Sequence, residues 1–170
     1  MLNREVASLL EQQINKELYS AYLYLDISNY YYAKNLDGFG NWFKIQAQEE
    51  RDHAMLFLTY LQNNGEAPKL TAIDAPDQDF ANFRDPLAAT LVHEEYVTSL
   101  IHAIYAEATK ANDFRTLQFL DWFVKEQGEE EKNANDLLGR FDLFGSDPKS
   151  LYALDAEMAA RTYSAPSLVL

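Results

Sequence analysis

The sequence predicts an all-α protein, a four-helix bundle with one long crossover connection and a short fifth helix at the C-terminal end. Apolar side chains recur at spacings of three and four along four long segments, which is the period of one helix face. The 6 Gly and 5 Pro cluster between these segments, unlike the pattern of a protein built from short strands. With 170 residues and 48% hydrophobic composition, the chain can bury one core, so we expect a single domain over residues 1–170.

The expected helices are, in order, 4–34, 39–64, 85–111, 114–142 and 147–162. Turn residues separate the first two segments, and Asn64-Gly65 ends the second. Asp85-Pro86 and Asp147-Pro148 each place a capping residue before a proline at the first helical position. Residues 163–170 follow the fifth helix, and we expect them to form a flexible tail.

The lengths of the connections predict the topology. Segments 4–34 and 39–64 are joined by a few residues, as are 85–111 and 114–142, so each pair should form an antiparallel hairpin. The connection 65–84 can reach over about 60 Å at ~3.3 Å per extended residue, whereas the second helix is about 40 Å long. It can therefore cross the whole bundle. The fifth helix is too short to be stable alone, so its apolar stripe should need neighbours, and symmetry mates are expected to supply them.

The chain is strongly acidic, with a net charge of -13 and a pI near 4.5. This charge opposes binding to nucleic acid or to an anionic membrane and favours the attraction of cations. No run of 18 apolar residues is present, so neither a membrane span nor a secretory signal is expected. The lack of cysteine excludes disulfides and agrees with a reducing compartment. We therefore expect a cytoplasmic protein whose partners are metal ions and copies of itself.

Polar residues interrupt the apolar faces near the middle of all four long segments. Burying an ionised carboxylate costs on the order of several kcal/mol unless a nearby cation compensates its charge. Carboxylates with a single imidazole suit iron or manganese. The alternative is that these residues lie on the surface. All four helices would then have to be rotated about their axes away from the orientation that their apolar stripes predict, and at the same depth in the bundle. The residues are Glu17, Glu50, His53, Glu94, Gln127 and Glu130.

Three motifs carry a family resemblance: residues 15–22 (NKELYSAY), 47–54 (AQEERDHA) and 126–132 (EQGEEEK). With them the chain resembles the ferritins, specifically the non-haem bacterial-type ferritins, over essentially residues 1–162. The resemblance implies ferroxidase activity, in which Fe(II) is oxidised by O2 or peroxide at a di-iron centre. It also implies storage of ferric mineral in a shell of twenty-four subunits.

The same resemblance assigns the site residues. Glu17, Glu50 and His53 would bind the first iron, with Glu50 bridging to the second. Glu94 would bind the second iron, with Gln127 as a nearby hydrogen-bonding group and Glu130 at its edge. Tyr24 matches the family tyrosine beside the di-iron centre, although ordinary packing would also explain a tyrosine there.

Differences from the motifs of related families exclude several of those families. Bacterioferritin would carry a second Glu-x-x-His where this chain has Gln127-x-x-Glu130, and its haem-binding methionine would fall at Arg51, so haem is not expected. A rubrerythrin would need cysteines, and a Dps-like protein would lack the fifth helix. His93 and His102 show no partner pattern and are expected to be structural.

Further acidic residues adjoin the expected ligands and predict a third iron site. Glu49, Glu126 and Glu129, together with Glu130, would form an all-oxygen cage if the second and fourth helices are neighbours. The alternative is a solvated acidic helix face.

Two other functions remain open. The chain could be a non-catalytic scaffold subunit whose acids nucleate mineral, although a scaffold has no need for buried acids. It could also be a di-iron oxygenase or peroxidase. An oxygenase needs an apolar pocket over the metals.

Overall fold

The computed structural model describes residues 2–170; Met1, with which the expected domain begins, lies outside the described residues. These residues form five helices and no strand, which confirms the all-α prediction. The four long helices lie within two residues of the expected bounds, whereas the fifth ends at Met158 rather than at 162. The helices are α1 (Arg4–Tyr32), α2 (Asp37–Asn63), α3 (Asp85–Lys110), α4 (Phe114–Phe144) and α5 (Pro148–Met158).

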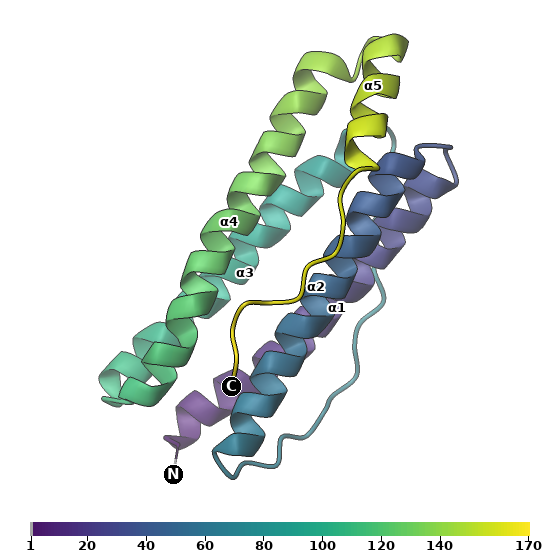
Figure 1. Cartoon of the computed structure of the whole chain (residues 1–170). Helices are drawn as coiled ribbons and strands as arrows, with labels where there is room; N and C mark the ends of the chain where they lie inside the picture. The colour runs from purple at the N-terminus through teal and green to yellow at the C-terminus, as the bar shows by residue number, and fades with distance from the viewer. Residues whose placement is uncertain (1) are drawn as a thin grey trace.

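The helices form two hairpins, α1 with α2 and α3 with α4, packed side by side (Figure 1). Both hairpin turns contain an asparagine in the left-handed region, Asn35 with φ 58° and Asn112 with φ 54°. Asparagine tolerates this conformation better than most residues. The segment between α2 and α3 runs the length of the bundle, as expected, and is fixed to α1 by a hydrogen bond from Asn15 Nδ2 to the Ala72 carbonyl (2.8 Å).

Helix capping follows the sequence at one proline-initiated helix and differs at the other. Asp147 caps α5 by accepting a hydrogen bond from Ser150 N (2.8 Å). Asp85 was expected to cap α3, and this is wrong, because the cap position is Arg84 and Asp85 is the first helical residue. The Asp85 carboxylate instead accepts a hydrogen bond from Ala81 N (2.9 Å), which orders the end of the crossover.

The fifth helix packs on its own bundle, against α2 and α4. Asp155 Oδ1 of α5 accepts a hydrogen bond from Phe39 N (3.0 Å) and so satisfies a free amide in the first turn of α2. Gly38 permits this approach, because a Cβ there would lie 1.7 Å from the Asp155 carbonyl oxygen. Leu154 and Met158 are buried in the core of the same chain, so part of the stripe expected to need symmetry mates has neighbours without them.

The C-terminal residues 163–170, expected to form a flexible tail, lie extended beside α2 (Figure 1). Tyr163 donates a hydrogen bond to Asp52 of α2. Trp122 of α4 donates to Ser167 Oγ (2.9 Å), so the segment bridges α2 and α4.

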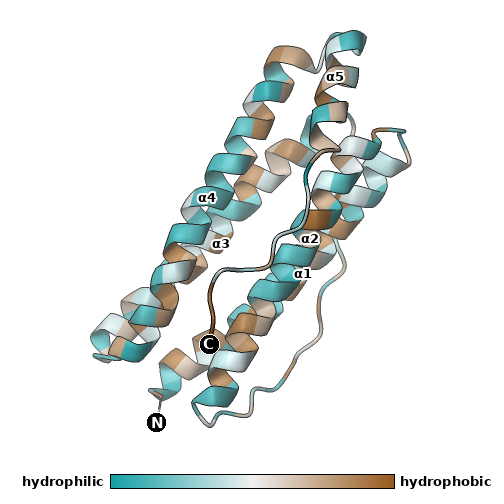
Figure 2. Ribbon diagram, viewed as in Figure 1, coloured by the Kyte–Doolittle hydropathy of each residue, from teal (hydrophilic) through white to brown (hydrophobic). Residues whose placement is uncertain are grey.

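The core consists of two hydrophobic clusters, one toward each end of the bundle. One contains Leu10 and Phe57, and the other contains Tyr31 and Phe43. Hydrophilic residues alternate with hydrophobic ones along the helices (Figure 2). None of the helices in residues 2–170 combines the length and the apolar character that a membrane crossing requires.

Candidate metal centre

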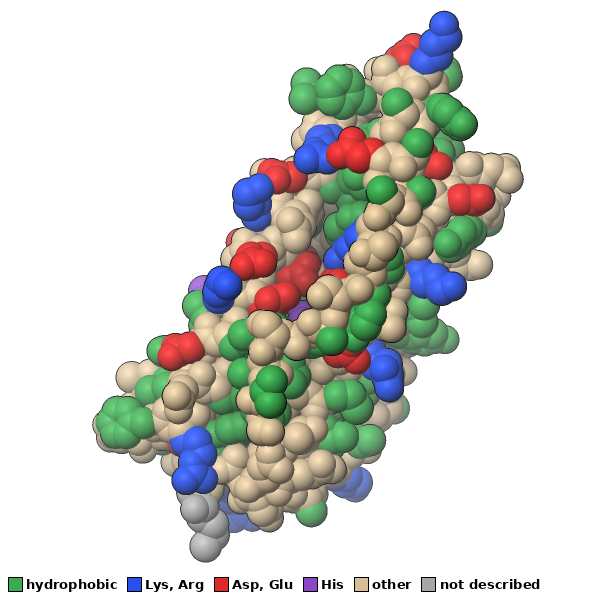
Figure 3. Space-filling model, in the orientation of Figure 1, with side chains coloured by type: hydrophobic (Ala, Val, Ile, Leu, Met, Phe, Trp, Pro, Cys, Tyr) green, Lys and Arg blue, Asp and Glu red, His purple; other side chains and the backbone are tan. Residues whose placement is uncertain are grey.

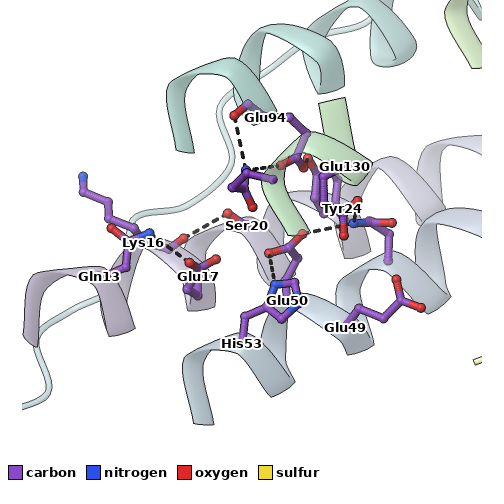
Figure 4. A network of polar contacts seen from close by, with 12 residues as sticks. Gln13, Lys16, Glu17, Ser20, Tyr24, Glu49, Glu50, His53, Glu94 and Glu130 are labelled. Carbon is purple, nitrogen blue, oxygen red and sulfur yellow. Dashed lines mark hydrogen bonds and ion pairs between the residues drawn. The ribbon is translucent and has the colours of Figure 1, made fainter. Parts of the chain in front are cut away.

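A buried polar layer separates the two hydrophobic clusters and contains all six polar residues that the sequence placed at mid-helix. Each of these side chains is at most 5% exposed. Glu17 comes from α1, Glu94 from α3, and the remaining residues come in pairs from α2 and α4. Figure 4 shows Glu17, Glu50, His53, Glu94 and Glu130 turned toward one common region.

The first candidate metal position is formed by Glu17, Glu50 and His53, which offer ligand atoms within 4.8 Å of one another. His53 Nδ1 lies 3.4 Å from Glu50 Oε2. Gln13 Nε2 donates a hydrogen bond to Glu17 Oε1 (2.9 Å), but the buried Oε2 of Glu17 has no partner within residues 2–170. A buried oxygen without a partner is costly, and a cation bound there would satisfy it.

The second candidate position is formed by Glu50, Glu94 and Glu130, again with ligand atoms within 4.8 Å. Tyr24 donates a hydrogen bond to Glu94 Oε1, and Gln127 Nε2 lies 3.2 Å from Glu94 Oε2. Glu50 belongs to both candidate positions, so its carboxylate lies within reach of an ion at either one.

Burial and mutual repulsion perturb the protonation of this layer. Burial, followed by the charge of Glu50, raises the pKa of both Glu17 and Glu94 to about 8. Burial also raises the pKa of Glu130 well above its usual range, and the charge of Glu94 adds to this effect. For His53, burial alone would lower the pKa, but the hydrogen bond and charge of Glu50 outweigh it and raise the pKa to about 10. The metal-free layer thus retains protons where bound cations would otherwise balance its charge.

A third group of possible ligands lies beside the layer, on the side of the C-terminal segment. His53, Glu126 and Glu130 offer ligand atoms within 4.8 Å of one another. They border a cavity of about 300 Å³ that is also lined by Glu49, Glu129 and residues 164–167. Acidic side chains gather in this hollow between α4 and the C-terminal segment (Figure 3).

The structure therefore brings together only part of the four acids predicted to form a third iron site. Glu126 and Glu130 lie together, and α2 and α4 both border the cavity, as the prediction required. Glu49 instead forms an ion pair with Arg161 (2.5 Å), and it points away from the common region in Figure 4. Glu129 is exposed and lies 3.5 Å from Lys125 Nζ.

Several residues that contact the layer were not among those predicted from the sequence. Gln46 Nε2 donates to Glu50 Oε1 (3.1 Å) and to Glu130 Oε2 (2.8 Å). Gln46 precedes Glu50 by four residues, as Gln13 precedes Glu17, and this repeated helical spacing was the available signal. His93, expected to be structural, contacts Ser20 Oγ through Nε2 (2.8 Å) and packs edge-on against Tyr24.

Comparison with known proteins agrees with this arrangement. The family model described as "Ferritin-like domain" matches residues 7–144. The bacterial non-heme ferritin of Campylobacter jejuni is 37% identical over 155 residues, which are 91% of this chain and 93% of that protein. The bacterial non-heme ferritin of Staphylococcus saprophyticus is 33% identical over 163 residues, 96% of this chain and 98% of that protein.

Solved structures extend the comparison to the fold. An engineered closed form of the Archaeoglobus fulgidus ferritin has a TM-score of 0.94 at 36% identity, covering 96% of this chain and 100% of that one. A structure described as a novel open pore ferritin from the same archaeon has a TM-score of 0.93 at 36% identity, covering 95% and 100%. Sequence and fold are thus shared over nearly the whole chain.

Proposed function

Because the chain belongs to the ferritin family, we propose that it is a ferroxidase and iron store that oxidises Fe(II) at the Glu50-centred pair of positions. Copies of the chain would assemble into a shell, of twenty-four subunits by its resemblance to the family, which holds the ferric mineral. The observation that carries the proposal is the sharing of Glu50 between two buried ligand groups.

Iron is the substrate in this reaction. Two Fe(II) ions each lose one electron, and O2 accepts the two electrons with two protons to give hydrogen peroxide. Carboxylate oxygens favour the harder Fe(III) product, so a carboxylate-rich site promotes oxidation. The single imidazole of His53 must lose a proton before it binds an ion.

The surrounding groups would hold the ligands for this chemistry. Tyr24 and Gln127 each hydrogen-bond one oxygen of Glu94, so they fix the carboxylate of the second position. Tyr24 is fully buried and bonded to a ligand of the second position, which supports a further role as an electron or hydrogen-bond donor there.

We propose that iron also visits a third position beside the layer. His53, Glu126 and Glu130 support it, with Glu49 and Glu129 as flanking acids in the same cavity. Because this position borders the open cavity, it should hold iron more loosely than the two buried positions. It would act as a relay or as an extra source of electrons.

The lining of the cavity bears on the alternative functions. An oxygenase needs apolar walls above its metals, whereas this cavity is bordered by four carboxylates: Glu49, Glu126, Glu129 and Glu130. The complete buried ligand set likewise disfavours a scaffold without catalysis, because a scaffold gains nothing from buried acids.

Aerobic addition of Fe(II) to the metal-free protein tests the proposal. We expect fast ferric absorbance that saturates at two irons per chain. Glu50→Ala should abolish this phase, and Glu95→Ala, which removes an exposed acid next to Glu94, should preserve it. Slow oxidation without saturation in the unmodified protein would contradict the proposal.

A further inference from the structure

Arg161, which follows α5, contacts three residues of α2 next to the metal layer. Its Nη2 lies 2.5 Å from Glu49 Oε2 and 2.9 Å from Gln46 Oε1. Its guanidinium also lies over the Trp42 ring, 4.2 Å from the ring centre. The Arg161 and Glu49 side chains are only 19% and 18% exposed, so this is not an ordinary surface pair.

The backbone around Arg161 is fixed independently of its side chain. Asn41 Nδ2 donates a hydrogen bond to the Arg161 carbonyl oxygen (3.1 Å). The preceding helix is held by the contact of Asp155 with Phe39 N. The packing of α5 therefore determines where the guanidinium lies.

The bond to Gln46 determines which end of that amide faces the metal layer. Arginine can only donate hydrogen bonds, so the Gln46 oxygen must face Arg161. The Gln46 amino group then faces Glu130 and Glu50, to which it donates. A reversed amide would place its oxygen against two carboxylates.

The bond to Glu49 removes that carboxylate from the third position. Glu49 lines the same cavity as His53, Glu126 and Glu130, but its ligand atoms do not join their close group. A cation that recruits Glu49 must compete with a guanidinium already placed at hydrogen-bond distance.

We propose that Arg161 is a positioning residue that withholds Glu49 from a third metal ion and, through Gln46, directs N–H donors toward Glu50 and Glu130. This inference rests on the proposed function, because it assumes that the Glu50-centred positions bind metal. Its consequence is an order of filling, in which the two buried positions load first and the third stays weak while Arg161 holds Glu49.

The test is calorimetric titration of the metal-free protein with Zn²⁺, a divalent ion without redox chemistry. Arg161→Gln should raise the affinity for the third Zn²⁺ equivalent by about tenfold, which is the scale of one hydrogen bond to a charged group. The first two equivalents should be unchanged or weaker. For Arg161→Lys, the affinity for the third Zn²⁺ ion should lie between those of the unmodified protein and Arg161→Gln. A lysine ammonium retains the charge but lacks the planar guanidinium that binds Gln46 and Glu49 together. A merely structural role would weaken all equivalents.

Two further variants make the result specific. Arg140→Gln removes an exposed arginine that pairs with Glu157 of α5, and it should behave like the unmodified protein. Glu49→Gln should cancel the tightening in the Arg161→Gln background. On its own it should change the third equivalent less than twofold, which also tests the inference if the Arg161 variants do not fold.

An unchanged or weaker third equivalent in folded Arg161→Gln would overturn the inference while leaving the proposed function intact. So would a tenfold loss of the third equivalent in Glu49→Gln alone. Failure of the unmodified protein to bind the first two equivalents would overturn the proposed function, and the inference with it.

Discussion

The hydroxyl of Tyr24 donates a hydrogen bond to the carboxylate of Glu94, joining α1 to α3 across 70 residues of sequence. Gln127 of α4 holds the other oxygen of the same carboxylate. Three helices therefore fix the orientation of one acid in the metal layer. Fixed ligands reduce the reorganisation that metal binding requires.

Replacement of Tyr24 by phenylalanine should slow the fast phase of Fe(II) oxidation by about tenfold, because it leaves a buried ligand oxygen without its donor. Helix content and assembly should not change. Stopped-flow absorbance measures the rate, and Tyr60→Phe is the matched control, since Tyr60 is a buried tyrosine bonded to Thr116 in the distant cluster (2.9 Å). Equal rates in both variants would remove Tyr24 from the reaction.

Loss of a single ligand should reveal which carboxylate is shared. Glu17→Ala and Glu94→Ala should each lose one of the first two Zn²⁺ equivalents, whereas Glu50→Ala should lose both, because only Glu50 belongs to both positions. The Glu50 variant should still fold, since removal of its charge relieves the repulsion that raises the pKa of Glu17 and Glu94. Calorimetry gives the stoichiometry; one remaining tight equivalent in Glu50→Ala would argue against bridging.

Metal binding should release protons. Glu17 and Glu94 have pKa values of about 8, and His53 of about 10, so all three are mostly protonated near neutral pH in the metal-free chain. Glu130, whose pKa burial also raises well above its usual range, is protonated as well; each of the four must be deprotonated to bind an ion, so roughly three to four protons should leave per pair of ions. Affinity should accordingly rise between about pH 6 and pH 8. Titrations in buffers with different ionisation enthalpies count the protons, and a pH-independent affinity would contradict these assignments.

Two glycine replacements should have opposite effects on stability. Gly38→Ala should lower the thermal midpoint, because the new Cβ would collide with the Asp155 carbonyl and displace α5. Gly139→Ala should stabilise the chain by about 1 kcal/mol, because a Cβ there meets no atom of residues 2–170 within 4 Å and alanine favours the helix. Thermal unfolding followed by circular dichroism compares them, and a destabilised Gly139→Ala would show that this helix face is covered in the assembled protein.

Glu126→Ala tests the third position directly. The first two equivalents should bind normally, because Glu126 is in neither buried group. The amount of iron oxidised per O2 and the rate of later turnovers should both change. Oxygen-electrode measurements give the ratio, with Lys125→Ala as a control at the adjacent exposed position. An unchanged ratio would show that the acidic residues of the cavity form only a solvated helix face and not an iron site.

The sequence predicted the features that depend on the helical period and on how far along its helix a residue lies. Glu17 and Glu94 could be placed in one layer because helices of similar length bring their midpoints together. The sequence did not reveal Arg161, because this residue follows the last helix and meets Glu49 across 112 residues without any repeating pattern. The same limit applies to Asp155, whose contact with α2 depends on how a short helix packs and not on its own periodicity.

The two buried ligand groups divide unequally between the hairpins. Glu17, Glu50 and His53 all belong to α1 and α2, so an ion there joins helices that a short turn already connects. Glu94 and Glu130 come from the other hairpin, so an ion bound between them and Glu50 would cross-link the two halves of the molecule. An ion in that second position would therefore add to the hydrogen bonds that already join the two hairpins, Tyr24 to Glu94 and Gln46 to Glu130, and its occupancy would report that the two halves have docked.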